Sequence, residues 1–525
     1  MGTPTPRTDA RPLDLSDIQS WAESVTVETH SGPDAKNIFS NMPIPNLIPS
    51  QWETFDPSQR PPPFGHAMKR YMPLDEDYVN LNPGSWGTLP LPVLFAVTRY
   101  AYEIERIPDK LHWVTFQPLL NKARSAIAKL IGAETDEVVF APNATHALNT
   151  VLRNFEWREG DLLIGASTLY GAITNTIRYL ADRSEQPRPE APVIEYNFPL
   201  THSQILDIFR TKLREFKREY SQSQFTDVPP LSPGHTSDAT KRKNKMVVIF
   251  DSISATPGVL MPWREMVRIC RDEGVWSVVD AAHSIGQESG LDLGEIKPDF
   301  WITDCHKWLY AKRGCAVLYV PRRNQNIIKS SIPTGHGYVS PRSVKYEELG
   351  TNLAGQHTWT GTADQTAYIT IPDALAFREW LGGEKVINDY CHQLALDGGR
   401  RLAQVLGTCL MDETGELTLN MTNVMLPLPV ESTPGELYSE EQIEHINVYL
   451  RDTLLHEWKT YASHYFHAGA WWCRCSAQVF NELSDFDYLG KALNAVCADV
   501  RDSMLLEKTS PTDLISPSYP ALAHL

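Results

Sequence analysis

Residues 300–320 read FWITDCHKWLYAKRGCAVLYV, in which a short polar segment separates two apolar runs. Two short apolar runs, residues 300–303 and 315–320, are predicted to be buried β-strands. Lys307 lies between a histidine and a tryptophan, just past the end of the first run. Most lysines in such turns are solvated, but a buried amine that is neutral can attack a carbonyl and form a Schiff base. Taken alone, Lys307 leaves both interpretations open.

Strand-like runs alternate with helix-like segments upstream of this stretch. The runs that predict strands are residues 137–141, 161–167, 192–198, 246–250 and 276–282. The segments between them have the apolar spacing of helices. This alternation predicts an α/β fold with a mostly parallel, doubly wound sheet. Ligands of such sheets bind at the carboxyl ends of the strands, so the residues that follow each strand are candidates for a site.

The chain divides into four predicted segments. They are an N-terminal extension (1–65), a large cofactor-binding domain (66–365), a smaller α+β C-terminal domain that packs with the N-terminal segment (366–508) and a tail (509–525). Helices of the smaller domain are predicted at 365–381, 440–458 and 484–505, with strands at 422–430, 461–466 and 471–480. Residues 221–245 are polar and low in complexity, which predicts an inserted surface loop.

Composition and charge exclude several classes of protein. The 525 residues are 42% hydrophobic and carry a net charge of -16, which argues against nucleic acid and anionic membrane surfaces as partners. No apolar run is long enough to span a membrane, and the first residues lack the apolar core of a signal peptide. We therefore expect a cytoplasmic protein. The final Ala523-His524-Leu525 is a loose variant of the peroxisomal Ser-Lys-Leu ending.

The cysteines predict neither a disulfide framework nor a metal site. Eight cysteines are few for a disulfide scaffold in so long a chain, and no CxxC pair occurs. Cys473 and Cys475 are expected to place both sulfurs on one face of a strand, but a zinc site would need more ligands nearby. We predict reduced thiols and no metal.

Two further strand ends carry residues that suit a phosphorylated ring. Asn143, Ala144 and Thr145 begin a helix, where free N–H groups and the helix dipole can hold a phosphate. A simple helix cap by Asn143 or Thr145 is the commoner use of such residues. Tyr170 stands between a strand and the next helix, where its ring could stack on a flat ligand or pack inside the protein.

A third strand end carries a carboxylate. Asp280 ends a buried apolar strand, and His283 follows three residues later. A buried carboxylate is costly unless it meets a cation such as a protonated ring nitrogen, although Asp280 could also cap the next turn. An anion cradle, a stacking ring, this carboxylate and Lys307, in this order on successive strands, together suit pyridoxal phosphate.

At these residues the sequence resembles the class V, fold type I family of pyridoxal-phosphate enzymes. The matching motifs, in family order, are NLNPGSWG, NATHALNTVLRN, LYGA, SATPG, DAAH, DCHKWL, RGCAVLYVP, GHG, GTAD and RCSAQVFNELSDFDYL. Within the family the sequence is most similar to the isopenicillin-N-epimerase-like group, especially to fungal hercynylcysteine sulfoxide lyases and related enzymes of specialised metabolism. Pro83 stands where these relatives typically carry a histidine.

The resemblance implies a cofactor role for each matching residue. Lys307 would carry the cofactor as a Schiff base and shuttle the substrate Cα proton, and Asp280 would pair with the pyridine N–H. Tyr170 would stack on the ring and share in catalysis. The further cofactor contacts that the resemblance implies are Asn143, Ala144, Thr145, Ser254, His283 and His306, with Gly361 and Thr362 reaching the phosphate held by the partner subunit of a homodimer.

The resemblance also implies a substrate site and a reaction. Arg474 would grip the α-carboxylate of a small amino-acid substrate with both prongs of its guanidinium. The other substrate contacts would be Asn82, Ser85, Trp86 and His336. The expected reaction is cleavage of a C–S bond by a lyase through an external aldimine. An epimerase, a decarboxylase or a C–C bond-forming cyclase, acting on a modified amino acid in fungal alkaloid-type metabolism, would use the same motifs and stays an alternative.

Overall fold

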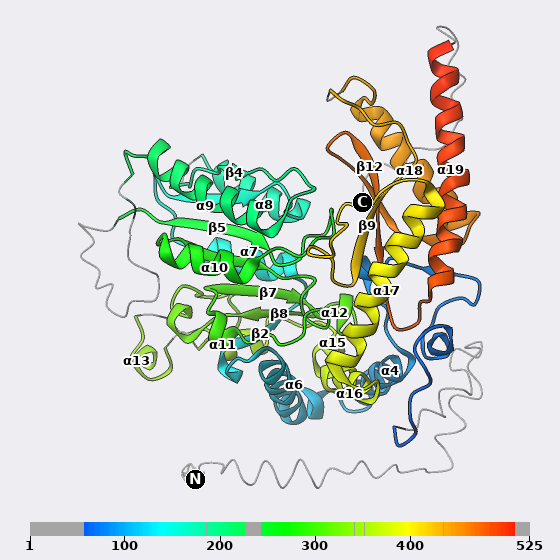
Figure 1. Ribbon diagram of the computed structural model, residues 1–525. Coiled ribbons are helices and arrows are strands. Elements are labelled where there is room, and N and C mark those ends of the chain that lie inside the picture. Colours follow the sequence, from blue (N-terminus) through cyan, green and yellow to red (C-terminus); the bar gives the residue numbers. More distant parts are fainter. Residues whose placement is uncertain are drawn as a thin grey trace, which may run out of the picture. The chain divides into compact units, whose positions relative to one another are not determined.

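The larger of the sheets has seven strands in the order β2-β8-β7-β6-β5-β3-β4 (Figure 1). The computed structural model describes residues 57–184, 187–223, 225, 243–335, 337–340, 342–350, 352–433 and 435–509. The strands are β2 (Val138–Ala141), β3 (Leu162–Ala166), β4 (Val193–Ile194), β5 (Met246–Asp251), β6 (Trp276–Asp280), β7 (Phe300–Asp304) and β8 (Ala316–Tyr319). Strand β8 is antiparallel to both its neighbours, and the other pairings are parallel. The predicted α/β fold with a mostly parallel sheet is confirmed.

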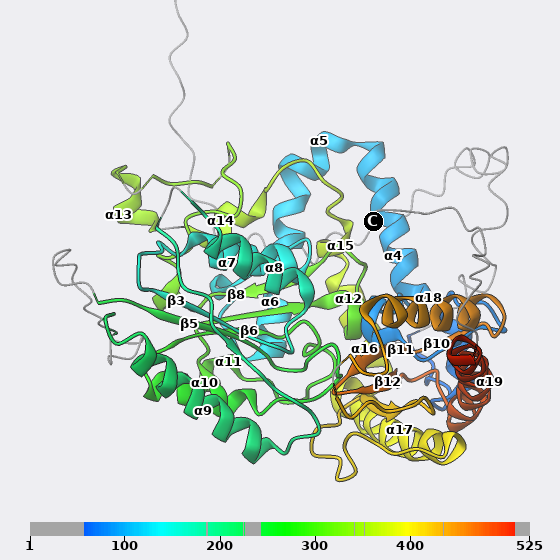
Figure 2. The same cartoon turned by 90° about the horizontal axis from the view of Figure 1, so that it is seen from above.

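Helices cover both faces of this sheet, as the continuous apolar strands require. Helices α7 and α8 lie on one face, and α9 and α10 lie on the other (Figure 2). The helices of this part of the chain are α3 (Pro83–Trp86), α4 (Leu91–Arg106), α5 (Pro108–Lys110), α6 (Phe116–Ile131), α7 (Ala144–Asn154), α8 (Gly171–Ala181), α9 (His202–Glu219), α10 (Trp263–Asp272), α11 (Leu293–Ile296), α12 (Cys305–Trp308), α13 (Lys345–Leu349), α14 (Leu353–Thr358), α15 (Thr366–Ile369) and α16 (Ile371–Trp380). Short helical turns are η2 (His66–Tyr71), η3 (Leu111–Thr115), η4 (Thr135–Glu137) and η5 (Arg322–Asn324).

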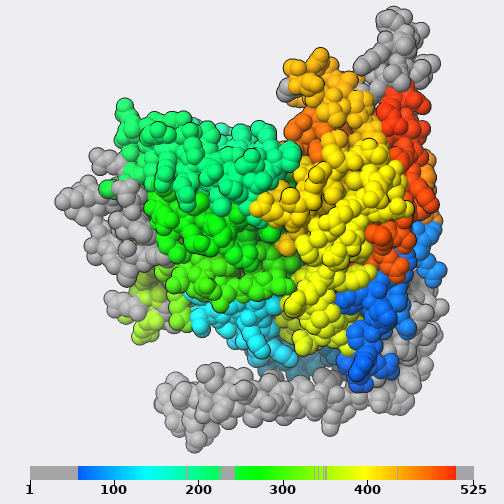
Figure 3. Space-filling model, in the orientation of Figure 1, coloured from blue at the N-terminus to red at the C-terminus, as the bar shows by residue number. Residues whose placement is uncertain are grey.

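A second core forms around a three-stranded antiparallel sheet in the order β11-β12-β9. Its elements are β9 (Met421–Met425), β11 (Ser463–His467), β12 (Ala470–Ser476), α17 (Gly383–Leu406), α18 (Glu440–His456) and α19 (Leu483–Thr509). An N-terminal strand, β1 (Val79–Asn80), pairs with β10 (Thr460–Tyr461), so the segment before the large sheet joins this second part. The surface of α17, yellow in Figure 3, borders both α19 and the green surface of the large sheet's helices.

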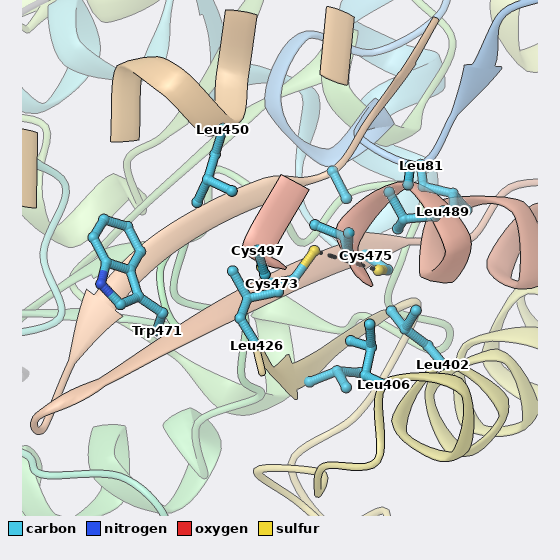
Figure 4. Close-up of a cluster of buried hydrophobic side chains, with 14 of the residues drawn as sticks. Leu81, Leu402, Leu406, Leu426, Leu450, Trp471, Cys473, Cys475, Leu489 and Cys497 are labelled. Atoms are coloured by element: carbon cyan, nitrogen blue, oxygen red, sulfur yellow. Dashed lines mark hydrogen bonds between the residues drawn. The ribbon is translucent and has the colours of Figure 1, made fainter. Parts of the chain in front are cut away.

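Buried thiols belong to this second core. Cys473, Cys475 and Cys497 lie among leucines such as Leu402 and Leu489 (Figure 4). The Sγ atoms of Cys473 and Cys475 are 3.9 Å apart, so both thiols are on one face of β12 as predicted. All eight cysteines fall in the described chain, and none forms a disulfide there. The thiols therefore act as small apolar side chains.

The sequence pattern does not predict helix α17, because Gly398 and Gly399 lie in its interior and lower its helix propensity. In the structure these glycines allow close packing. A Cβ atom at Gly398 would lie 2.4 Å from the Phe486 ring, and one at Gly399 would lie 2.4 Å from Thr422 Oγ1. Tertiary contacts with α19 and β9 thus outweigh the local preference.

Other differences are smaller. The strand predicted at 192–198 is confined to β4, and the helix predicted at 365–381 is divided at Thr370 into α15 and α16. The predicted domain boundary at 365/366 stays a prediction. The extension up to residue 56, most of the 221–245 insertion, His336 and the tail from residue 510 lie outside the described residues. Within the described ranges, no helix is long and apolar enough to cross a bilayer.

Candidate active site

Lys307 lies in a largely buried turn, residues 305–315, that connects β7 to β8 and is called the lysine turn below. Its side chain is 16% exposed, and its Nζ atom lies 3.2 Å from Asp304 Oδ2. Gly87, with φ of 67°, lets the N-terminal segment approach so closely that a Cβ atom there would lie 1.7 Å from the His306 carbonyl oxygen. The interpretation of Lys307 as a solvated surface lysine is therefore wrong, because neighbouring backbone and side chains enclose it.

Arg378 on α16 fixes the backbone next to Lys307. This guanidinium is almost fully buried and donates to the carbonyl oxygens of Trp308 (2.8 Å) and Gly286 (2.9 Å). Its Nε and Nη2 atoms also donate to the Glu384 carboxylate, at 2.5 and 2.6 Å. Nothing in the sequence around Arg378 indicates this role, because the sequence alone does not place α16 beside the lysine turn.

Replacing Arg378 by methionine is expected to lower the free energy of unfolding by about 3–5 kcal/mol, because it leaves Glu384 and two buried carbonyls without their partner. Urea denaturation measures this change. Arg401→Met is the matched control, because Arg401 forms a partly exposed ion pair with Asp487. Its expected effect is below about 1 kcal/mol. An equal loss of unfolding free energy in the two variants would contradict the role of Arg378 in holding the backbone next to Lys307.

Two buried carboxylates end neighbouring strands. Asp280 on β6 and Asp251 on β5 are register partners, and Thr168 Oγ1 donates to Asp251 at 2.7 Å. Burial raises the pKa of Asp280 to about 6, while the positive charge of Lys307 and the Ala282 N–H oppose this rise. Burial, reinforced by the charge of Asp280, raises the pKa of Asp251 well above its usual range. Burial thus outweighs the positive charge of Lys307, which acts on both carboxyl groups.

Asp280→Asn is expected to stabilise the ligand-free protein at pH 7 by about 3 kcal/mol, because each pKa unit corresponds to about 1.4 kcal/mol. A carboxyl whose folded pKa is raised favours the fold below its unfolded pKa, near 3.8, and loses that contribution as pH rises through about 6. The advantage of the variant should therefore shrink between pH 7 and pH 4, as measured by urea unfolding. An advantage that is the same at both pH values would contradict this explanation.

His283 is buried beside the lysine turn in its neutral form. Burial lowers the pKa of His283 well below its usual range, and the charges of Lys307 and Arg474 act in the same direction. Trp308 Nε1 donates to His283 Nδ1 at 3.3 Å. Because Nδ1 accepts this bond, the proton of the neutral ring is on Nε2, which is therefore a hydrogen-bond donor.

Arg474 brings the N-terminal segment and the second sheet to the same place. It lies on β12, and its Nη2 atom donates to Asn82 Oδ1 (2.8 Å) and Ser85 Oγ (2.6 Å). Its Nη1 atom donates to the Ala255 carbonyl oxygen at 2.7 Å. Gly258 makes room for the side chain, since a Cβ atom there would lie 2.7 Å from Arg474 Cδ. The predicted residues Asn82, Ser85 and Arg474 thus form one cluster.

The N-terminus of α7 already has two acceptors within the protein. The Asn143 side chain accepts from the His146 N–H at 2.8 Å, which is the helix-cap interpretation of this residue. The Ala144 N–H donates to Asp304 Oδ1 at 2.9 Å. Asp304 therefore joins this helix end to Lys307. Asp304 is not among the site residues predicted from the sequence, although its position at the end of β7 gives the same signal as Asp280 gives at the end of β6.

The remaining predicted site residues are less closely tied to this cluster. Tyr170 and Trp86 are 61% and 69% exposed, and Thr362 is also exposed. Ser254 is buried and its hydroxyl donates to the Pro257 carbonyl oxygen at 2.6 Å, within its own turn. Gly361 has a φ of 128° and no atom within 4 Å of an added Cβ. The ligand contacts proposed for these residues stay predictions.

Comparison with known proteins identifies the family. The model of the class-V aminotransferases matches residues 93–186 and 233–428. The chain belongs to the class V aminotransferase family. This confirms the family resemblance inferred from the motifs.

Three relatives of this class V aminotransferase-family chain show how far the similarity extends. The chain is 31% identical to the L-cysteine desulfhydrase-like protein lolT1 of Epichloe uncinata, over 83% of this chain and 97% of that protein. It is 29% identical to the hercynylcysteine sulfoxide lyase of Schizosaccharomyces pombe, over 83% of this chain and 98% of that protein. The solved structure of the cystine C–S lyase C-DES with its product cysteine persulfide matches with a TM-score of 0.61 and 17% identity, over 80% of this chain and 98% of that one. These matches confirm the predicted fold type I architecture.

Proposed function

We propose that this chain is a pyridoxal-phosphate-dependent lyase that cleaves the C–S bond of an amino-acid substrate. The family and the named relatives support both the cofactor and the lyase class. The single observation that carries the proposal is the enclosed position of Lys307 at the carboxyl end of β7. Its side chain is 16% exposed, its Nζ atom lies 3.2 Å from Asp304 Oδ2, and Oδ1 of the same carboxylate accepts from the Ala144 N–H at the start of α7.

The residues present fit the cofactor. His306 Nδ1 is buried and has no hydrogen-bond partner among the described residues, as expected of an atom that faces a ligand. Asp280 is a buried carboxylate that needs a cation, and a protonated pyridine nitrogen would supply one. When bound, the cofactor supplies an electron sink for bonds to the substrate Cα.

Each residue of the site would have a distinct task. Lys307 Nζ would hold the cofactor covalently and later take the proton from the substrate Cα. Arg474 would bind the substrate carboxylate, with Asn82 and Ser85 fixing the orientation of its guanidinium. His283 Nε2–H would donate to an oxygen of the bound cofactor. The enclosed lysine turn would limit the access of water to these groups.

The overall reaction converts an S-alkyl cysteine and water into pyruvate, ammonia and a thiol; L-cysteine would release sulfide in place of the thiol, and a sulfoxide would release a sulfenic acid. The Cα proton leaves to Lys307, the Cβ–S bond breaks, and the sulfur fragment leaves with the electron pair. The test is to incubate the holoenzyme with L-cysteine, S-alkyl cysteines and their sulfoxides in deuterated water. Pyruvate and the sulfur product should form in equal amounts. Deuterium at Cα without pyruvate would contradict the lyase proposal and favour the epimerase or cyclase alternative.

We also propose a homodimer with shared active sites. Trp113 and Val114 on η3 are 78% and 53% exposed, and large exposed apolar side chains of this kind mark interfaces. Helices α4 and α6 flank this turn at one edge of the protein (Figure 2). In such a dimer the exposed Thr362 would reach the phosphate in the partner's site. The cytoplasmic location and the peroxisomal alternative stay predictions.

Complementation tests the shared sites. Lys307→Ala and Thr362→Glu variants should each be inactive alone. Co-expressed, they form a mixed dimer in which one site has both native residues, so turnover should return to part of the wild-type level. Sedimentation as a monomer, or no recovery in the mixed dimer, would contradict the proposal.

A further inference from the structure

Asp304 places a negative charge where the proposed function needs an anion to bind. The residue is buried at the end of β7, and its side chain is only 7% exposed. Oδ1 accepts from the Ala144 N–H at the N-terminus of α7, and Oδ2 lies 3.2 Å from Lys307 Nζ. His306 Nδ1 is 3.9 Å from Oδ1. One carboxylate thus contacts the helix end, the reactive amine and the histidine that are assigned to the cofactor.

We propose that Asp304 acts as a counterion at the predicted phosphate site, the N-terminus of α7. The cofactor phosphate must displace this carboxylate or compete with it when it binds. This inference rests on the proposed function. A carboxylate is favoured at a helix N-terminus for the same reason as a phosphate, because both accept hydrogen bonds from the free N–H groups and interact with the positive end of the dipole. Asp304 therefore imitates the ligand's charge within the ligand-free protein.

The helix end leaves little room for two anions. The Asn143 side chain has already taken the His146 N–H, and Asp304 has taken the Ala144 N–H. Among the described residues, the Thr145 N–H has no acceptor. A phosphate at this place would share its donors with Asp304 and would lie beside a second negative charge. Like charges at such short range in a buried site repel strongly.

The competition has two consequences of opposite sign. In the ligand-free protein Asp304 stabilises the N-terminus of α7 and the lysine turn, because its charge compensates the Lys307 ammonium and the helix dipole. In the loaded protein the same carboxylate weakens the hold on the phosphate. Asp304 is thus a positioning residue that sets the affinity for the cofactor rather than a group that reacts with substrate.

Asp304→Asn tests this inference, because asparagine keeps an acceptor for the Ala144 N–H and removes the charge. The cofactor is removed from the wild type and the variant, and each is titrated with pyridoxal phosphate and, separately, with pyridoxal. Absorbance near ~420 nm follows binding. We expect the variant to bind pyridoxal phosphate about 10-fold more tightly, and to gain clearly less for pyridoxal, which forms the same bond to Lys307 but has no phosphate. Asp487→Asn on α19 is the control for a general change in net charge.

Thermal unfolding gives a second readout. The ligand-free Asp304→Asn variant should melt below the wild type, and pyridoxal phosphate should raise its melting temperature by more than it raises that of the wild type. Asp304→Ser provides a second neutral variant should the asparagine variant fold poorly. Because both readouts measure binding, neither depends on the activity of the loaded enzyme.

Each outcome decides the matter. A larger gain for pyridoxal phosphate than for pyridoxal supports the proposal. Unchanged or weaker binding of pyridoxal phosphate overturns it, and so does an equal gain for pyridoxal, because the effect would then not concern the phosphate. Wild-type protein that binds no pyridoxal phosphate at all would overturn the proposed function itself, which is a different result from a wild type that binds and a variant that gains nothing.

Discussion

Lys307→Ala is expected to remove both the yellow colour of the purified protein and its turnover. The wild type should absorb near ~420 nm, as a lysine-bound pyridoxal phosphate does. The variant lacks the amine that would hold the cofactor covalently and take the Cα proton, so we expect its kcat to fall by more than about 1,000-fold. Absorbance spectra and assays of pyruvate release measure the two effects.

Lys385→Ala is the matched control for this prediction. Lys385 is exposed on α17 and pairs with Asp389 at 2.6 Å. This variant should keep its colour and its activity. A Lys307→Ala protein with unchanged absorbance and turnover would contradict the assignment of Lys307 as the residue that holds the cofactor.

Arg474→Lys is expected to lower kcat/KM by about 100-fold with little change in the absorbance of the bound cofactor. Lysine keeps the charge but loses the two-pronged geometry, and a hydrogen bond between charged groups contributes about 1.5–3 kcal/mol. It also loses the donors to Asn82 and Ser85, so its ammonium would be less well oriented. Steady-state kinetics with an amino-acid substrate measures the loss.

The control for Arg474 is Arg451→Lys on α18, where the guanidinium is partly exposed and pairs with the neighbouring Asp452. This conservative change should leave kcat/KM within about twofold of the wild type. If Arg474→Lys also retains wild-type kcat/KM, the proposed grip on the substrate carboxylate is wrong. A loss of absorbance in Arg474→Lys would instead place the arginine at the cofactor.

Local signals were enough to predict most of the large sheet. Its strands are continuous apolar runs that end in polar residues, and Asp280 and Lys307 follow directly from that rule. The family motifs add Asn82, Ser85 and Arg474, which the fold brings together from opposite ends of the chain. For these residues, the neighbouring sequence or a family motif is enough to predict a place in the site.

Contacts between distant segments explain what the sequence does not reveal. Arg378 clamps the lysine turn from α16, and nothing in the sequence around it indicates that partner. Helix α17 depends on close packing at Gly398 and Gly399, two residues that argue locally against a helix. Asp304 precedes the motif lysine by three residues, but its bond to Ala144 links positions 160 residues apart. Tertiary structure therefore decides these features.

The site of the covalent bond to the cofactor can be located by chemical reduction, which tests whether Lys307 carries the Schiff base. Borohydride reduces a Schiff base to a stable amine, so the cofactor stays attached when the protein is digested. Mass spectrometry of the peptides then identifies the modified lysine. We predict one phosphopyridoxyl group per chain, on the peptide that contains Lys307, and none in Lys307→Ala. A modification on another lysine, or an unmodified Lys307 in protein that is yellow before reduction, would contradict the account.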